Sequence, residues 1–124
     1  MKPVREWVGW RTSEPRPCWL LVRAVLDARG FPPWQPGDAV ADWSPGDPIE
    51  QAAAPDWWTR LDLAEVVAGD VLVLRDERGV DAHCGLVAEG GWALHYQPSM
   101  GAMLVPMRAL HRARRIVSAW RPTR

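Results

Sequence analysis

Two short apolar runs flank a turn in the stretch HCGLVAEGGWALHYQ, which spans residues 83–97. Ala82–Ala88 and Trp92–Gln97 each have the length and composition of a strand. Glu89-Gly90-Gly91 lies between them and has turn composition, since glycine adopts the positive φ that tight turns require. The stretch therefore predicts a β-hairpin, and this hairpin constrains the rest of the fold.

The length of the turn decides which side chains share a face of the hairpin. A three-residue turn pairs position 88 with 92 and position 85 with 95, and side chains alternate between the two faces of a strand. His83 and His95 would then lie on one face of adjacent strands, and Cys84 would point to the other face and be packed. A two-residue turn at Gly90-Gly91 would place the two histidines on opposite faces.

The elements around the hairpin predict an α+β fold in which one helix packs on an antiparallel sheet. Cys18–Arg29 has apolar residues at helical spacing, with Pro17 suited to the first turn and Gly30 to the stop. Met1–Pro17 reads as an extended arm or short turn. The remaining expected elements are a second helix over Asp56–Val67, strands at Val71–Leu74, Met103–Val105 and Arg115–Trp120, a turn at Asp76–Gly79, and a short helical turn over Pro106–Arg112.

Length and charge narrow the functional classes. The 124 residues suffice for one domain, which we take as 1–124 with a Pro/Trp-rich insert at about 31–55. Lys and Arg number 15, as do Asp and Glu, so the chain has no electrostatic footprint for nucleic acid. No apolar run approaches the roughly 18–20 residues that span a bilayer, and Met1–Glu6 lack the apolar stretch of a secretory signal. We therefore expect cytoplasmic synthesis, no nucleic-acid partner and no membrane span.

Cys18, His83 and His95 are the residues best suited to chemistry. The N-terminus of a helix stabilises a thiolate through its dipole and offers N–H groups to an oxyanion, and Cys18 begins the expected helix. In the three-residue-turn register, His83 is placed to take the proton of Cys18 and His95 to orient the His83 ring. The alternatives are core packing for the thiol, a sheet-edge position for His83, and for His95, beside Tyr96, a cap over exposed apolar surface.

Three segments together resemble the NlpC-type peptidoglycan peptidases, which are papain-like cysteine enzymes. They are Pro17–Val22, Gly69–Leu74, and His83–Gly91 followed by Leu94-His95. The most similar branch is that of bacteriophage tails and gene-transfer particles, whose closing strand resembles Arg114–Val117. The resemblance covers roughly Trp7 to Arg121, without the Pro-rich insert.

This resemblance implies a papain-like NlpC-type fold whose N-terminal nucleophile helix packs on an antiparallel sheet. It implies that Cys18 is the nucleophile, His83 the general base and His95 the residue that orients His83. The implied activity is a phage tail-associated hydrolase that cleaves peptidoglycan stem peptides without a metal or organic cofactor. The implied partners are peptidoglycan peptides and other tail-tip proteins, and the implied location is a virion or gene-transfer-particle tail after synthesis in the bacterial cytoplasm.

Two positions differ from the family pattern and support an alternative. The family usually has Asp immediately before the cysteine and Gly two residues after it, whereas this chain has Pro17 and Leu20. Pro17 removes a backbone N–H, and Leu20 adds a branched side chain beside the helix start. A catalytically weakened or inactive fold that serves in tail-tip assembly is therefore the alternative, and an acyltransferase-type relative using the same Cys and His is a third reading.

Other candidate sites are weaker. Cys18, Cys84, His83 and His95 have the ligand types for zinc, but His83 and Cys84 are adjacent on a strand and point apart, so a zinc site is disfavoured. Asp70 reads as a turn residue more than a catalytic carboxylate. Trp57-Trp58 could lie on a helix with one ring facing a partner. A basic cluster reads as a solvated face, and its members are His111, Arg112, Arg114 and Arg115.

Overall fold

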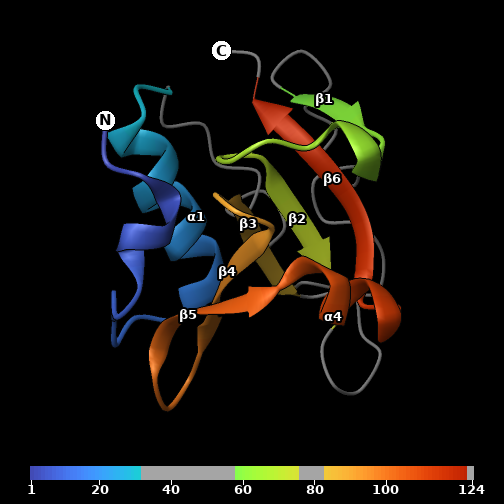
Figure 1. Cartoon of the computed structure of the whole chain (residues 1–124). Coiled ribbons are helices and arrows are strands. Elements are labelled where there is room, and N and C mark those ends of the chain that lie inside the picture. The colour runs from blue at the N-terminus through green and yellow to red at the C-terminus, as the bar shows by residue number, and fades with distance from the viewer. Residues whose placement is uncertain (32–57, 76–82, 123–124) are drawn as a thin grey trace.

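One six-stranded antiparallel sheet organises the part of the chain that the computed structural model describes, which is residues 1–31, 58–75 and 83–122 (Figure 1). Its strand order is β1-β6-β2-β3-β4-β5. The predicted α+β class is confirmed. The strands are β1 (Trp58–Leu61), β2 (Val71–Leu74), β3 (His83–Ala88), β4 (Trp92–Gln97), β5 (Gly101–Pro106) and β6 (Ile116–Pro122), and the helices are η1 (Val4–Trp7), α1 (Pro17–Ala28), η2 (Leu63–Glu65) and α4 (Met107–Arg112).

The α1 helix lies where the sequence predicts its main helix and packs on the sheet over β3 and β4. Pro17 occupies the first turn, where a missing N–H costs no hydrogen bond, and Gly30 follows the helix with a φ of +88°. Its buried face is made of Trp19, Leu21, Val22, Val25 and Leu26. This apolar stripe holds the N-terminal end of α1, and with it Cys18, against the sheet.

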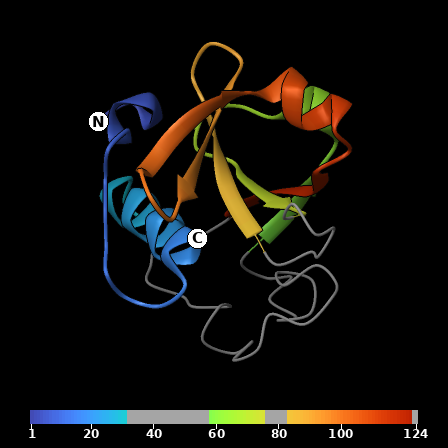
Figure 2. The same cartoon turned by 90° about the horizontal axis from the view of Figure 1, so that it is seen from below.

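The sheet carries an apolar core on each face. Because strand side chains alternate, Val71 and Val73 join the core under α1, whereas Leu72 and Leu74 join the second core. Leu110 of α4 closes the second core. In Figure 1 and Figure 2, α1 and α4 accordingly lie on opposite sides of the sheet.

The β3–β4 hairpin has the register that the three-residue turn predicts. Gly85 pairs with His95 and Ala88 with Trp92, and the chain reverses over Glu89–Gly91. Both glycines of the turn have a φ of +82°, a conformation that side chains with a Cβ rarely adopt. The Glu89 carboxylate also accepts hydrogen bonds from the backbone N–H groups of Val4 and Arg5, both at 3.0 Å, so the N-terminal segment is tied to this turn.

The prediction of a second helix over Asp56–Val67 is wrong for the described residues. Trp58–Leu61 forms strand β1, which pairs with β6, and only Leu63–Glu65 is helical, as a single 3-10 turn. Trp58 is buried, and pairing with β6 satisfies the backbone of this segment. Tertiary pairing thus outweighs the local helical pattern, and the reading of Trp58 on a helix face is wrong with it.

The structure agrees more closely with the remaining predicted elements. β2 has the predicted bounds, β5 and β6 extend the predicted strands, and α4 matches the predicted helical turn. The N-terminal arm contains one 3-10 turn, η1. The turn predicted at Asp76–Gly79 lies outside the described residues, as do residues 32–55 of the insert.

Asp70 has the structural role that its turn position predicts. Its carboxylate is 2% exposed and accepts two hydrogen bonds of 2.9 Å from the Arg121 guanidinium and one of 2.7 Å from the Val67 N–H. A buried carboxylate is stable only when such donors replace water. The ion pair joins the start of β2 to the end of β6.

Gly85 is the residue that lets β4 approach β3 beside the two histidines. A Cβ at this position would lie 2.6 Å from the Leu94 carbonyl oxygen and 3.3 Å from the His95 Cβ. We therefore expect Gly85→Ala to lower the free energy of unfolding by about 3 kcal/mol in urea titrations followed by Trp fluorescence.

Gly30→Ala is the matched control, because a Cβ there meets no atom within 4 Å and only the positive φ opposes it. Its expected cost is about 1 kcal/mol. Equal costs for the two variants would show that close approach at Gly85 does not constrain the hairpin.

Candidate functional site

The hairpin brings the His83 and His95 rings into direct contact on one face of the sheet. His83 Nε2 lies 3.2 Å from His95 Nδ1, and the two ring planes meet at 80°. The contact follows from the register, since Gly85 pairs with His95 and His83 lies two residues before Gly85 on the same face. The predicted shared face of the two histidines is confirmed.

His95 is suited to accept a hydrogen bond from His83. Burial, with smaller contributions from the charges of His83 and Arg115, lowers the pKa of His95 to about 4. His95 is therefore neutral at pH 7 and has one ring nitrogen free to accept a proton. When His83 is an imidazolium, both its nitrogens are donors, so His83 Nε2–H donates to His95 Nδ1.

This arrangement leaves His83 Nδ1 for Cys18. His83 lowers the pKa of Cys18 through its charge and a side-chain hydrogen bond, while its Nε2 is engaged with His95 Nδ1. A neutral His83 held in the Nε2–H tautomer has its lone pair on Nδ1, where a base for Cys18 is needed. His83 thus acts on Cys18 and contacts His95 at 3.2 Å.

The surroundings of Cys18 stabilise its thiolate form. Cys18 is half-buried in the first turn of α1, where the helix dipole favours a negative charge. The pKa of Cys18 lies well below its ordinary value, first because the Cys84 thiol hydrogen-bonds it. Burial opposes this shift, while the hydrogen bond and the charge of His83 reinforce it.

Cys84 is the site residue whose role the sequence does not predict. It is packed and, by strand alternation, points away from the face of His83, as expected. Its face, however, is the one that α1 covers, so Cys84 meets Cys18. Burial, the hydrogen bond to Cys18 and the Cys18 charge raise the pKa of Cys84 well above its ordinary value. Its alternation with core residues Leu86 and Ala88 is the sequence signal that places it under α1.

The start of α1 offers the Cys18 N–H as an oxyanion donor. Pro17 has no N–H, and the N–H groups of Trp19 and Leu20 both donate to the Arg16 carbonyl, at 3.1 and 3.2 Å. Among the described residues, no backbone carbonyl in a turn, loop or helix cap accepts a hydrogen bond from the Cys18 N–H. Arg16 has a φ of 58°, a left-handed conformation that is costly for a residue with a side chain and turns the chain into the helix.

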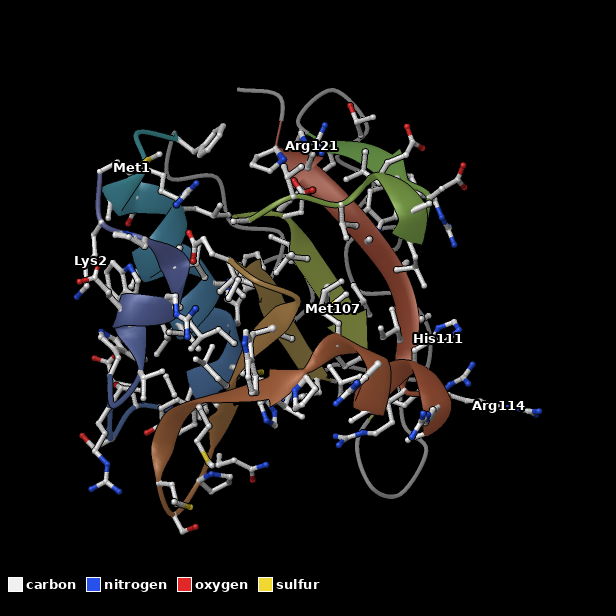
Figure 3. All side chains as sticks on the ribbon, viewed as in Figure 1. Met1, Lys2, Met107, His111, Arg114 and Arg121 are labelled. Atoms are coloured by element: carbon white, nitrogen blue, oxygen red, sulfur yellow. The ribbon has the colours of Figure 1, made fainter. Side chains whose placement is uncertain are left out.

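The basic cluster is only partly a solvated face. His111, Arg112 and Arg114 are exposed, and Figure 3 shows His111 and Arg114 projecting outward near the end of α4. Arg115 differs, because it is half-buried, its Nε donates to the Arg75 carbonyl at 3.0 Å, and its charge acts on His95. The sequence does not predict this link between Arg115 and the histidine pair.

In residues 1–31, 58–75 and 83–122, no three His, Cys, Asp or Glu side chains are grouped to hold a metal ion. Within the same ranges, no helix has the length and apolar character needed to cross a membrane. Neither a comparison with protein-family models nor one with curated proteins finds a match for this chain.

The environments of the two thiols predict different reactivities. At pH 7, iodoacetamide should alkylate Cys18 at least about 100-fold faster than Cys84, because Cys18 is the more exposed and more readily ionised thiol. Peptide mapping by mass spectrometry over a time course measures both rates. Equally slow labelling of the two cysteines would contradict an activated Cys18.

The lowered pKa of His95 predicts a pH-dependent stability. The unfolded chain binds a proton on His95 below pH 6.5, whereas the folded protein does so only near pH 4, so stability falls as the pH drops through this window. In a Cys18→Ala background, where this thiol cannot titrate, we expect a loss of about 2 kcal/mol between pH 7 and pH 5 in urea unfolding.

The matched comparison adds His95→Gln to the same background. Replacing the buried imidazole should remove most of that pH dependence. An unchanged difference between pH 7 and pH 5 would show that His95 is not the responsible group.

Proposed function

We propose that this chain is a papain-like cysteine hydrolase of the NlpC type that cleaves peptidoglycan stem peptides. The observation that carries the proposal is the 3.2 Å contact between His83 and His95, together with the lowering of the Cys18 pKa by His83 at the start of α1. A nucleophile, a base and a residue that orients the base are the parts that thiol acyl transfer requires. The sequence resemblance to NlpC-type peptidases supplies the substrate class.

In the proposed reaction, the Cys18 thiolate attacks the carbonyl carbon of the scissile amide. The oxyanion that develops on the carbonyl oxygen accepts a hydrogen bond from the Cys18 N–H, for which no backbone acceptor is found at the helix start among the described residues. The His83 imidazolium then gives its Nδ1 proton to the leaving amine, and a thioester remains on Cys18.

Hydrolysis of the thioester completes the cycle. His83 Nδ1 takes a proton from water, the resulting hydroxide attacks the thioester carbonyl, and Cys18 leaves as the thiolate. Throughout, His95 accepts the Nε2–H of His83 and keeps its ring orientated, which a histidine with a pKa of about 4 does as a neutral acceptor. The chemistry uses only the protein's own side chains and backbone N–H groups and requires no metal or organic cofactor.

We also propose the setting that the resemblance implies. The protein would be made in the bacterial cytoplasm and carried on a phage or gene-transfer-particle tail, with other tail-tip proteins as neighbours. Delivery by a particle would bring the hydrolase to the cell wall at the point of entry.

A second candidate function is a structural tail-tip component that keeps this fold with weak or no turnover. The observation that favours it is the composition of the first turn of α1. Pro17 removes one oxyanion donor, Arg16 takes the N–H of Trp19, and a half-buried Leu20 replaces the small residue of the family pattern. Loss of one donor costs an acyl-transfer site roughly 10²–10³-fold in rate.

Release of new amino groups from purified peptidoglycan separates the two functions. The wild-type protein should release them, Cys18→Ala should abolish release, and His83→Ala should lower the rate by about 10²–10⁴-fold. His111→Ala is the matched control, because this histidine is exposed on α4 (Figure 3), and the activity of the variant should equal that of wild type.

Inert wild-type protein, together with Cys18→Ala particles that still assemble and infect, would favour the structural function. Equal amine release by wild type and Cys18→Ala would contradict the thiol mechanism altogether.

A further inference from the structure

The two cysteines of this chain are neighbours across the interface between α1 and the sheet. Cys18 packs against the core cluster that contains Cys84, under α1, and each thiol shifts the pKa of the other. Both are free thiols. They are also the only cysteines in the sequence, 66 positions apart, since 84 − 18 = 66. The fold therefore builds a dithiol from residues that are distant along the chain.

The thiols differ in the way that a peroxide-reactive pair requires. Cys18 is half-buried and lies at the positive end of a helix, beside His83, so it is the sulfur that a small oxidant meets as a thiolate. Cys84 is 1% exposed and reaches no bulk oxidant, but it faces Cys18. An accessible thiolate next to a second thiol is the arrangement of a redox-active cysteine with its resolving partner.

We propose that Cys18 and Cys84 form a reversible oxidation site, in which a hydroperoxide oxidises Cys18 and Cys84 resolves the product as an intramolecular disulfide. The inference concerns the two thiols alone and holds whether or not Cys18 cleaves amides.

In the first step, the Cys18 thiolate attacks the terminal oxygen of the hydroperoxide. A sulfur–oxygen bond forms, the oxygen–oxygen bond breaks, and the alkoxide or hydroxide that leaves takes a proton from the His83 imidazolium. Cys18 becomes a sulfenic acid and has lost two electrons to the peroxide.

In the second step, the Cys84 sulfur attacks the Cys18 sulfur and displaces hydroxide, which leaves as water with the Cys84 proton. The net reaction converts two thiols and one hydroperoxide into a disulfide, an alcohol or water, and one further water. The first step prepares the second, because the Cys18 charge raises the pKa of Cys84 and a neutral sulfenic acid removes that charge.

Closure requires a modest movement. A disulfide bond is about 2.05 Å long, which is shorter than a hydrogen-bond contact between two sulfur atoms. Cys84 lies within a central strand paired on both sides, whereas Cys18 lies in the first turn of α1. The Cys18 side chain is therefore the one that turns toward its partner.

Treatment of the full-length protein with hydrogen peroxide tests this proposal without any peptidoglycan. We expect intact mass spectrometry to show the loss of two hydrogen atoms and no reaction with N-ethylmaleimide, and non-reducing peptide mapping to join the Cys18 and Cys84 peptides. Dithiothreitol should restore two maleimide-reactive thiols.

Cys84→Ser is the decisive variant, since it keeps the size of the side chain and removes the resolving sulfur. We expect dimedone to trap Cys18 sulfenic acid in this variant at least about tenfold more than in wild type, followed by irreversible sulfinic acid on prolonged exposure. Cys18→Ser should leave Cys84 unoxidised under the same conditions, because Cys84 is buried.

Equal dimedone trapping in wild type and Cys84→Ser, or disulfides that join two chains only, would overturn the proposal. The peptide map of wild-type protein decides the question even if a variant fails to fold. An inactive hydrolase that still forms the disulfide, or an active one that does not, separates this proposal from the proposed function.

Discussion

The number of residues in the turn between β3 and β4 is the constraint on which the candidate site depends. Strand side chains alternate, so a turn of three residues places His83 and His95 on one face, while a turn of two would separate them. Two glycines with a φ of +82° make the longer turn possible, and Glu89 ties it to the N-terminal segment. The 3.2 Å contact between the rings is a consequence of this register.

Burial and polar contacts together set the pKa values of the site residues. Burial alone would raise the pKa of a thiol and lower that of an imidazole. His95 follows the rule, with a pKa of about 4, and is thereby kept as a neutral acceptor. Cys18 departs from it, because the hydrogen bond from Cys84 and the contacts of His83 outweigh the burial. Burial raises the pKa of Cys84, so this thiol keeps its proton and lowers the pKa of Cys18 as a hydrogen-bond donor.

Local sequence patterns correctly predict α1 and the hairpin, and they wrongly predict a helix over Asp56–Val67. The α1 helix and the hairpin follow from residues close together in sequence, since their apolar spacing, Pro17 and the turn glycines act locally. The predicted helix over Asp56–Val67 is wrong because Trp58–Leu61 pairs with β6, more than fifty residues away. No local signal records such a partner, and backbone pairing with burial of Trp58 decides the outcome.

The sequence by itself determined the order of Cys18, His83 and His95 and the helix that carries the thiol, and it left open whether the hairpin turn has two or three residues. Only the tertiary structure decided that α1 covers the face of Cys84, that Arg115 acts on His95, and that Asp70 is held by Arg121. The physical reason is one of range. Alternation and helix capping act between neighbours along the chain, whereas packing across the sheet joins residues whose separation in sequence has no relation to their distance in space.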